Sequence, residues 1–332
     1  MNRWKKNLTV AFVLCLLCAI CPRAAAKDND TVFLGGMPFG LKLYTSGVLV
    51  INVDTYSSAD MAGIKKNDVI MTADDEEITS NEQLKEIITT SQGEDIELLL
   101  SRDNTPITVT LTPGMNDDSE YEAGLWVRDS TAGLGTVTYF DESTMSFGAL
   151  GHGVCDRDTG MLMPLKNGEI MDAQITSITR AERGVAGGLN GYMSDTSIGS
   201  ITLNNAFGVY GRYHTLMSDT RIQCAGDEEI TTGDATLYAT VDDSGVTPYK
   251  VEIETVTPDN KNGQNMVVRV TDETLLQKTG GIVQGMSGSP IVQNGKLVGA
   301  VTHVFVNAPE KGYGISIGNM RRNYASYGGI TG

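Results

Sequence analysis

A chain of 332 residues is longer than a single hydrophobic core usually serves, so we expect two domains. Its formal net charge of −16 excludes the basic surface that binding to nucleic acid requires. Hydrophobic residues make up 40% and charged residues 20% of a chain with 38 glycines, which indicates a globular protein rich in turns and, with its many Val, Ile and Thr residues, in β structure.

The first 26 residues have the pattern of a secretory signal peptide. Residues 1–6 carry three basic side chains, an apolar run ends at Cys21, and Ala24 and Ala26 supply the small residues that a signal peptidase recognises. The apolar run is shorter than the roughly 20 residues of a membrane-spanning helix, although an uncleaved anchor stays open as an alternative. We therefore expect an exported protein.

Only Cys155 and Cys224 follow this segment. Two cysteines are too few for a disulfide framework, and they have no zinc-binding spacing. One disulfide or two buried thiols would both agree with the sequence. We expect no metal ion and no organic cofactor.

Residues 31–113 predict a small separate domain. A strand-like stretch at 43–53 is followed by a glycine-containing stretch at 57–78, a helix at 80–90 and a pair of alternating strands at 95–113. The helix begins with a capping box and has one apolar face, so the domain has the means to form its own core.

The stretch from Ala59 to Ile70 resembles a PDZ domain of the bacterial protease type. It reads A-x-x-A-G-I-x-x-x-D-x-I, and Asn67 stands where such domains usually have glycine, as the residue that best tolerates a left-handed turn. A PDZ domain binds an extended peptide by adding it to a sheet edge. The resemblance therefore implies a rim that binds peptide. The bound peptide could be a segment of another protein or of this chain. The expected rim residues are Phe39, Gly40, Leu41 and Lys42. Alternatively, Phe39 and Leu41 are ordinary core residues.

From 117 to 332 the chain consists of short β-prone segments separated by glycines, which is typical of a barrel or sandwich. The segment 281–306, GIVQGMSGSPIVQNGKLVGAVTHVFV, resembles the trypsin-like pattern GDSGGPLV…LVGIVSWG. The match implies a chymotrypsin-like double β-barrel serine protease domain. Ser287 would be its nucleophile, and the N–H groups of Gly285 and Ser287 would form the oxyanion hole.

A serine nucleophile needs a base, and the chain has three histidines. His152 ends a strand-like segment between two glycines, which suits delivery to a cleft between barrels. His303 lies on the strand that returns after the serine, where a structural or substrate-facing role is expected, and His214 has no informative neighbours. If Ser287 is catalytic, we predict that His152 is the base.

Further motifs together resemble the SpoIVB peptidase family, the stage IV sporulation serine peptidases of endospore-forming bacteria. They are LGHGV-x-D, IGSITLN, GIVQGMSGSPI and VTHVFVNAPEKGYGI. The family places an acid shortly before the serine, so the resemblance implies a triad of Ser287, His152 and Asp272. The residues alone would not select Asp272, because other aspartates such as Asp156 and Asp158 compete for the role.

The resemblance also implies a biological role. The expected substrate is the exported part of a membrane-bound regulator of an intramembrane protease, cleaved between forespore and mother cell to activate a late sigma factor. Self-cleavage is expected as well. Two alternatives stay open: a catalytically inactive PDZ adaptor, and an envelope quality-control protease, although the latter usually carries its PDZ domain after the protease domain.

Overall fold

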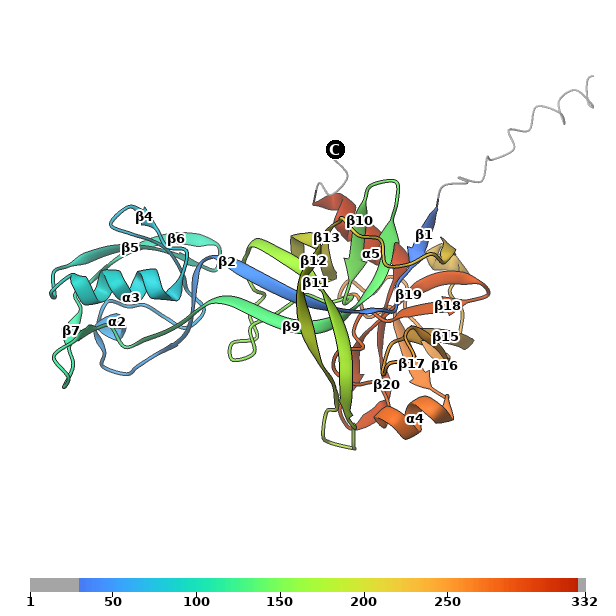
Figure 1. The fold of residues 1–332 in the computed structure, drawn as a ribbon. Coiled ribbons are helices and arrows are strands. Elements are labelled where there is room, and N and C mark those ends of the chain that lie inside the picture. Colours follow the sequence, from blue (N-terminus) through green and yellow to red (C-terminus); the bar gives the residue numbers. More distant parts are fainter. Residues whose placement is uncertain (1–29, 328–332) are drawn as a thin grey trace, which may run out of the picture. The chain divides into compact units, whose positions relative to one another are not determined.

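The computed structural model describes residues 30–327, so the predicted signal peptide lies outside the described residues. From Val32 onward these residues form one compact unit, in which strands predominate (Figure 1). None of the helices in the described part of the chain is both long and apolar enough to cross a membrane.

The N-terminal half contains the strands and helices β1 (Thr31–Leu34), β2 (Pro38–Val53), α2 (Ser58–Met61), β3 (Val69–Ala73), β4 (Glu76–Glu77), α3 (Asn81–Thr90), β5 (Ile96–Arg102), β6 (Thr105–Leu111), β7 (Gly114–Met115), β8 (Tyr121–Glu122), β9 (Leu125–Asp141) and β10 (Ser146–Ala149). The C-terminal half contains β11 (Leu165–Thr179), β12 (Gly188–Asn205), β13 (Gly208–Tyr213), β14 (Arg221–Cys224), the short 3₁₀ helix η1 (Asp227–Glu229), β15 (Gly233–Ala239), β16 (Thr247–Val256), β17 (Met266–Val270), α4 (Glu273–Thr279), β18 (Pro290–Gln293), β19 (Lys296–Phe305), β20 (Ala308–Ser316) and α5 (Ile317–Ser326).

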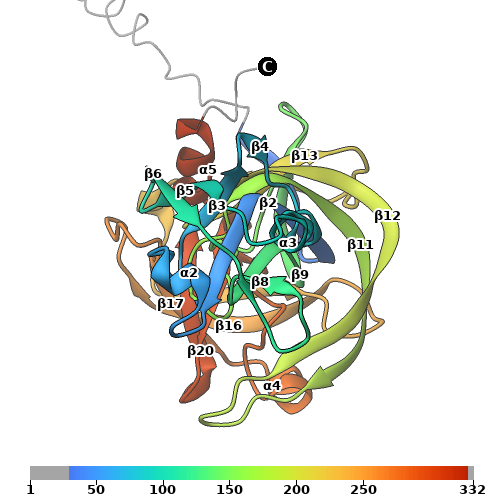
Figure 2. The same cartoon turned by 90° about the vertical axis from the view of Figure 1, so that its left-hand side faces the viewer.

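Six antiparallel strands close a first barrel. β2 pairs with β9 and with β11, β10 joins β9 to β13, and β12 lies between β11 and β13. β11 and β12 form a long pair of strands (Figure 2). Alternate side chains of these strands point inward, and the barrel core includes the fully buried Phe39, Phe140 and Phe147.

A second barrel also closes through six antiparallel strands. Its ring runs β15, β16, β17, β20, β19 and β18, and β18 pairs again with β15. Leu237, Ile253, Val268 and Ile291 fill its core and are fully buried. The predicted chymotrypsin-like double β-barrel is therefore confirmed.

The predicted PDZ domain has a third core, made by Ile70, Leu84, Leu98 and other residues of β2, β3, α3, β5 and β6. Asn67 adopts the left-handed conformation expected of it, with φ of 77°. The buried Asp68 receives two hydrogen bonds of 2.7 Å from the guanidinium of Arg102. This ion pair ties the turn that precedes β3 to the end of β5.

The strand predicted to form the peptide-binding rim lies elsewhere. Residues 38–44 of β2 belong to the first barrel, where β9 occupies one edge of the strand and β11 occupies the other. Phe39 and Leu41 are buried in the barrel core. The structure therefore corrects the prediction that Phe39, Gly40, Leu41 and Lys42 bind peptide, because no edge is left for an added strand.

A segment far away in the sequence takes the place of this strand in the PDZ domain. Residues 125–128 at the start of β9 pair antiparallel with residues 49–53 at the end of β2. Both β2 and β9 thus contribute one end to the PDZ core and the other end to the first barrel (Figure 1). This double use of two long strands distinguishes the fold from two domains joined by a linker.

Candidate active site

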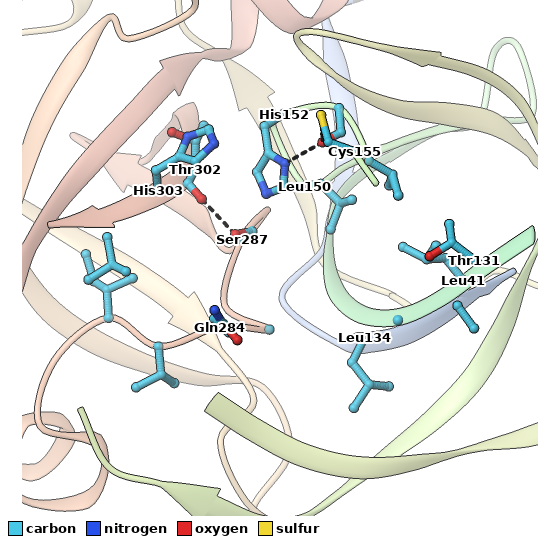
Figure 3. A pocket seen from close by; sticks show the side chains of 18 residues that line it. Leu41, Thr131, Leu134, Leu150, His152, Cys155, Gln284, Ser287, Thr302 and His303 are labelled. Atoms are coloured by element: carbon cyan, nitrogen blue, oxygen red, sulfur yellow. Dashed lines mark hydrogen bonds between the residues drawn. The ribbon is translucent and has the colours of Figure 1, made fainter. Parts of the chain in front are cut away.

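A cavity of about 510 Å³ is lined by residues of both barrels. The first barrel contributes residues 131–134 of β9, Leu150 and residues 152–155. The second contributes residues 282–285, Ser287 and residues 302–304. Figure 3 shows the side chains of Ser287, His152 and His303 gathered on one side of this cavity. The structure therefore brings the predicted nucleophile and the predicted base to the same site.

The backbone of the turn around Ser287 requires its glycines. Gly285 and Gly288 have φ of +96° and +95°, a region that residues with a side chain rarely adopt. A Cβ atom on Gly288 would lie 2.0 Å from the carbonyl oxygen of Thr136. Thr136 also fastens the turn to β9, since its N–H donates to Ser287 O (3.0 Å) and its Oγ1 donates to Gly285 O (2.8 Å).

The predicted oxyanion hole has its donors available. Within the described part of the chain, the backbone N–H groups of Gly285 and Ser287 have no hydrogen-bond acceptor. Both residues line the cavity. Two such donors beside a serine hydroxyl are the arrangement that stabilises the negative oxygen of a tetrahedral intermediate.

His152 presents the tautomer that a general base needs. Its Nδ1 lies 2.8 Å from Gly153 O, and because a carbonyl only accepts, Nδ1 carries the proton and Nε2 is the acceptor. Ser287 Oγ donates instead to Thr302 O at 2.7 Å, and no hydrogen bond joins it to His152 (dashed lines in Figure 3). The two side chains line one cavity without a hydrogen bond between them.

Partial desolvation lowers the pKa of both histidines of the cavity, of which His152 is half-buried and His303 is more exposed. Desolvation lowers the pKa of His152 to about 4; the Gly153 carbonyl opposes this effect and the neighbouring His303 adds to it. Burial also lowers the pKa of His303. The two imidazole rings lie 4.6 Å apart between centroids, so a second positive charge would be unfavourable beside the first.

Asp272 is not part of this cavity. It is the N-cap residue of α4: its Oδ1 accepts from Leu275 N at 3.0 Å and its Oδ2 accepts from Lys250 N at 3.2 Å. The structure does not bring its carboxylate to His152, whose Nδ1 is held by Gly153 instead. No aspartate or glutamate is among the residues that line the cavity.

The sequence left the state of the two cysteines open and gave no sign of the role of Thr136. Cys155 is exposed and lines the cavity, Cys224 is buried, and no disulfide joins them. The anchoring role of Thr136 was missed, because no local pattern marks a strand residue that approaches a turn about 150 residues away.

Two family models match the chain. Residues 119–321 match the family model described as SpoIVB peptidase S55, and residues 35–112 match the model for a PDZ domain. No curated protein matches the chain.

Three solved structures illustrate the similarity. The active form of the Rv3671c protease from M. tuberculosis is 15% identical, with a TM-score of 0.36 over 59% of this chain and 74% of that one. The HtrA-type protease AlgW with decapeptide is 12% identical, with a TM-score of 0.36 over 60% of this chain and 54% of that one. The PDZ domain of the SdrC-like protein (Lmo2051) from Listeria monocytogenes is 14% identical, with a TM-score of 0.23 over 25% of this chain and 87% of that one.

Proposed function

The chain belongs to the SpoIVB peptidase S55 family and carries a PDZ domain, and on this premise we propose that it is a serine endopeptidase acting through Ser287 and His152. The observation that carries the proposal is one cavity lined by a serine from a glycine-containing turn, two available N–H donors and an imidazole with an acceptor Nε2. A binding protein with no catalytic activity has no need of this combination.

The first chemical step forms the bond between enzyme and substrate. Ser287 Oγ leaves the Thr302 carbonyl by rotation of its side chain, transfers its proton to His152 Nε2 and attacks the carbonyl carbon of a peptide bond. The carbonyl π electrons move to the oxygen, and the N–H groups of Gly285 and Ser287 stabilise the resulting anion.

The remaining steps release the two products. The imidazolium of His152 gives its proton to the leaving amine as the C–N bond breaks, which leaves an acyl ester on Ser287. Water then loses a proton to Nε2 and attacks the ester carbonyl, and the serine is restored when the second intermediate collapses. Each proton that His152 accepts is thus returned within the cycle.

The third member of the triad rests on the family resemblance alone. We propose Asp272 for this role, although in this structure its carboxylate caps α4 and the Gly153 carbonyl holds His152 Nδ1. A carboxylate on Nδ1 would stabilise the imidazolium more strongly than a carbonyl does. Contact between Asp272 and His152 would require a rearrangement around α4.

The proposed biological role follows from family membership. We propose that the exported peptidase acts in endospore formation, between forespore and mother cell. There it would cleave the extracytoplasmic part of a membrane-bound regulator of an intramembrane protease, leading to activation of a late sigma factor, and it would also cleave itself. The PDZ domain supports a protein or peptide as substrate.

A fluorophosphonate probe tests the catalytic assignment directly. The probe should label the purified protein at Ser287, and the Ser287→Ala and His152→Ala variants should each lose labelling, with little further loss in the double variant, because triad members act as a unit. Exposed His214 supplies the matched control, and His214→Ala should be labelled normally. Labelling at another residue, or none in the unaltered protein, would favour the inactive adaptor.

A further inference from the structure

One edge of β9 has no strand partner over more than half its length. β2 pairs with one edge of β9 from Leu125 to Thr136. β1 continues this edge at Tyr139 and Phe140, and on the opposite edge β10 pairs only with residues between 137 and 141. Among the described strands, none therefore covers the outer edge between Leu125 and Gly135, and such an edge is a template for an additional strand.

This open edge borders two cavities. Residues 131–134 line the cavity that contains Ser287. Residues 123–127 line a second cavity of about 480 Å³, whose other wall is helix α3. Figure 2 shows α3 beside β8 and β9, which both contact it. A single strand edge thus leads from the nucleophile to a groove in the PDZ domain.

The groove has a defined chemical character. The buried Leu84 and Ile88 of α3 face it, which gives it an apolar floor. Its charged lining consists of Asp54, Lys85, Glu120 and Glu122, with an excess of carboxylates. An extended peptide with apolar side chains and at least one basic residue complements this lining.

Resting on the proposed peptidase function, we propose that a protein substrate adds one extended segment to the open edge of β9, with its scissile bond at Ser287 and its following residues in the α3 groove. The direction follows from the pairing. Every strand that pairs with β9 does so antiparallel, and β9 runs from the groove toward Ser287. An antiparallel substrate therefore runs from Ser287 toward the groove, so the groove receives residues C-terminal to the cleaved bond.

The strand geometry sets the spacing. Leu125 borders the groove and Leu134 borders the Ser287 cavity, so nine residue steps separate them along β9. At ~3.3 Å per residue this is about 30 Å. The bound side chains should lie about nine residues after the scissile bond. When the groove holds these substrate residues, the effective concentration of the scissile bond at Ser287 rises without any new contact at Ser287.

Binding can be tested apart from cleavage. A display library of random twelve-residue peptides is selected on the full chain carrying Ser287→Ala. Thr89 lies on the exposed rim of the groove, and Thr89→Trp would fill it, whereas Glu86→Trp alters an exposed residue of the same helix outside the groove. Affinity measured by fluorescence anisotropy should fall at least ten-fold with Thr89→Trp and stay unchanged with Glu86→Trp. If no peptide is recovered, or if both variants bind equally well, the proposal that the α3 groove binds the substrate is wrong.

Cleavage then tests direction and spacing. Reduced, unfolded casein identifies a bond that the unaltered protein cuts, and a selected peptide is placed 3, 9 or 15 residues after that bond. KM should be lowest near nine residues and at least ten-fold higher at three. Casein cleaved without any spacing effect, or improved only when the peptide precedes the bond, overturns this inference alone. Casein left intact by a protein that also fails to react with fluorophosphonate contradicts the proposed function itself.

Discussion

The burial of His152 predicts that the nucleophile stays active in mild acid. Burial is the main reason that the pKa of this imidazole falls from 6.5 to about 4. At pH 5.5, a histidine with a pKa of 6.5 is neutral in only about one molecule in ten, whereas one with a pKa of 4 is neutral in nearly all. The reaction of Ser287 needs the neutral imidazole. We therefore expect activity at pH 5.5 within about a factor of two of that at pH 7.5, instead of a roughly ten-fold loss.

The second-order rate constant of fluorophosphonate labelling, measured from pH 4 to pH 8, reports this pKa in the free protein. His303→Asn removes a neighbour that lowers the pKa of His152, so the acid limb should move to higher pH, while His214→Asn should leave it in place. The same shift has a consequence for stability: the contribution of neutral, buried His152 is complete above pH 6.5 and is lost as the pH falls toward 4. An acid limb centred at or above pH 6.5 in the unaltered protein would refute the reasoning.

Three further substitutions test the structure elsewhere. Asp272→Ala should lower the free energy of unfolding in urea by about 1 kcal/mol, because the α4 cap is lost, whereas Asp272→Asn should keep the cap. Asp272→Asn should also reduce the labelling rate by about 10⁴, as the proposed triad role requires; normal labelling of this variant would contradict that role. Gly288→Ala should slow fluorophosphonate labelling by about 10²-fold or more, because the added Cβ would collide with the Thr136 carbonyl and displace the turn around Ser287. Normal labelling of this variant would contradict the described geometry of that turn. Asp68→Asn should destabilise the PDZ core by about 3 kcal/mol, because Arg102 loses the buried carboxylate with which it pairs. Hydrogen exchange of the PDZ core measures this loss, and unchanged exchange would contradict the ion pair.

The parts of the site that the sequence predicts are those set by local backbone requirements. Ser287 lies between residues that adopt positive φ or approach a strand closely, and glycine is the residue that permits both. Asn67 in its left-handed turn and Ser80 as the cap of α3 are further examples, because each requirement involves only neighbours along the chain. Patterns of this kind are visible in one sequence without an alignment.

The pairing of a strand with its neighbours, unlike a local backbone requirement, depends on segments that are far away in the sequence. Residues 38–44 form a strand with alternating side chains, and this alternation is the same whether the neighbouring strands belong to a PDZ sheet or to a barrel. The pairing of this stretch with residues 130–136 and 165–172 depends on contacts across roughly 90 to 130 positions. The local sequence therefore does not reveal that this strand belongs to the first barrel, and the predicted peptide-binding rim is wrong.

Asp272 illustrates a signal that carries two interpretations. An aspartate immediately before the helical stretch ETLLQKT is a strong N-cap pattern, and the structure gives it that role. The family resemblance assigns catalysis to the same residue. The two carboxylate oxygens have enough lone pairs for the N–H groups of Leu275 and Lys250 and for a further donor. The roles are separated by position, because Asp272 does not line the cavity and His152 Nδ1 donates to the Gly153 carbonyl.

The strand β9 links these observations physically. Its C-terminal half fastens the nucleophile turn through Thr136, and its N-terminal half forms one wall of the groove beside α3. β2 pairs with one edge of β9 from Leu125 to Thr136, so residues 125–127 and the residue that fastens the nucleophile turn belong to one strand pair. In the proposed mode of substrate binding, a peptide in the groove and the scissile bond at Ser287 therefore lie along one strand. This arrangement depends on a PDZ domain that shares β2 and β9 with the barrel.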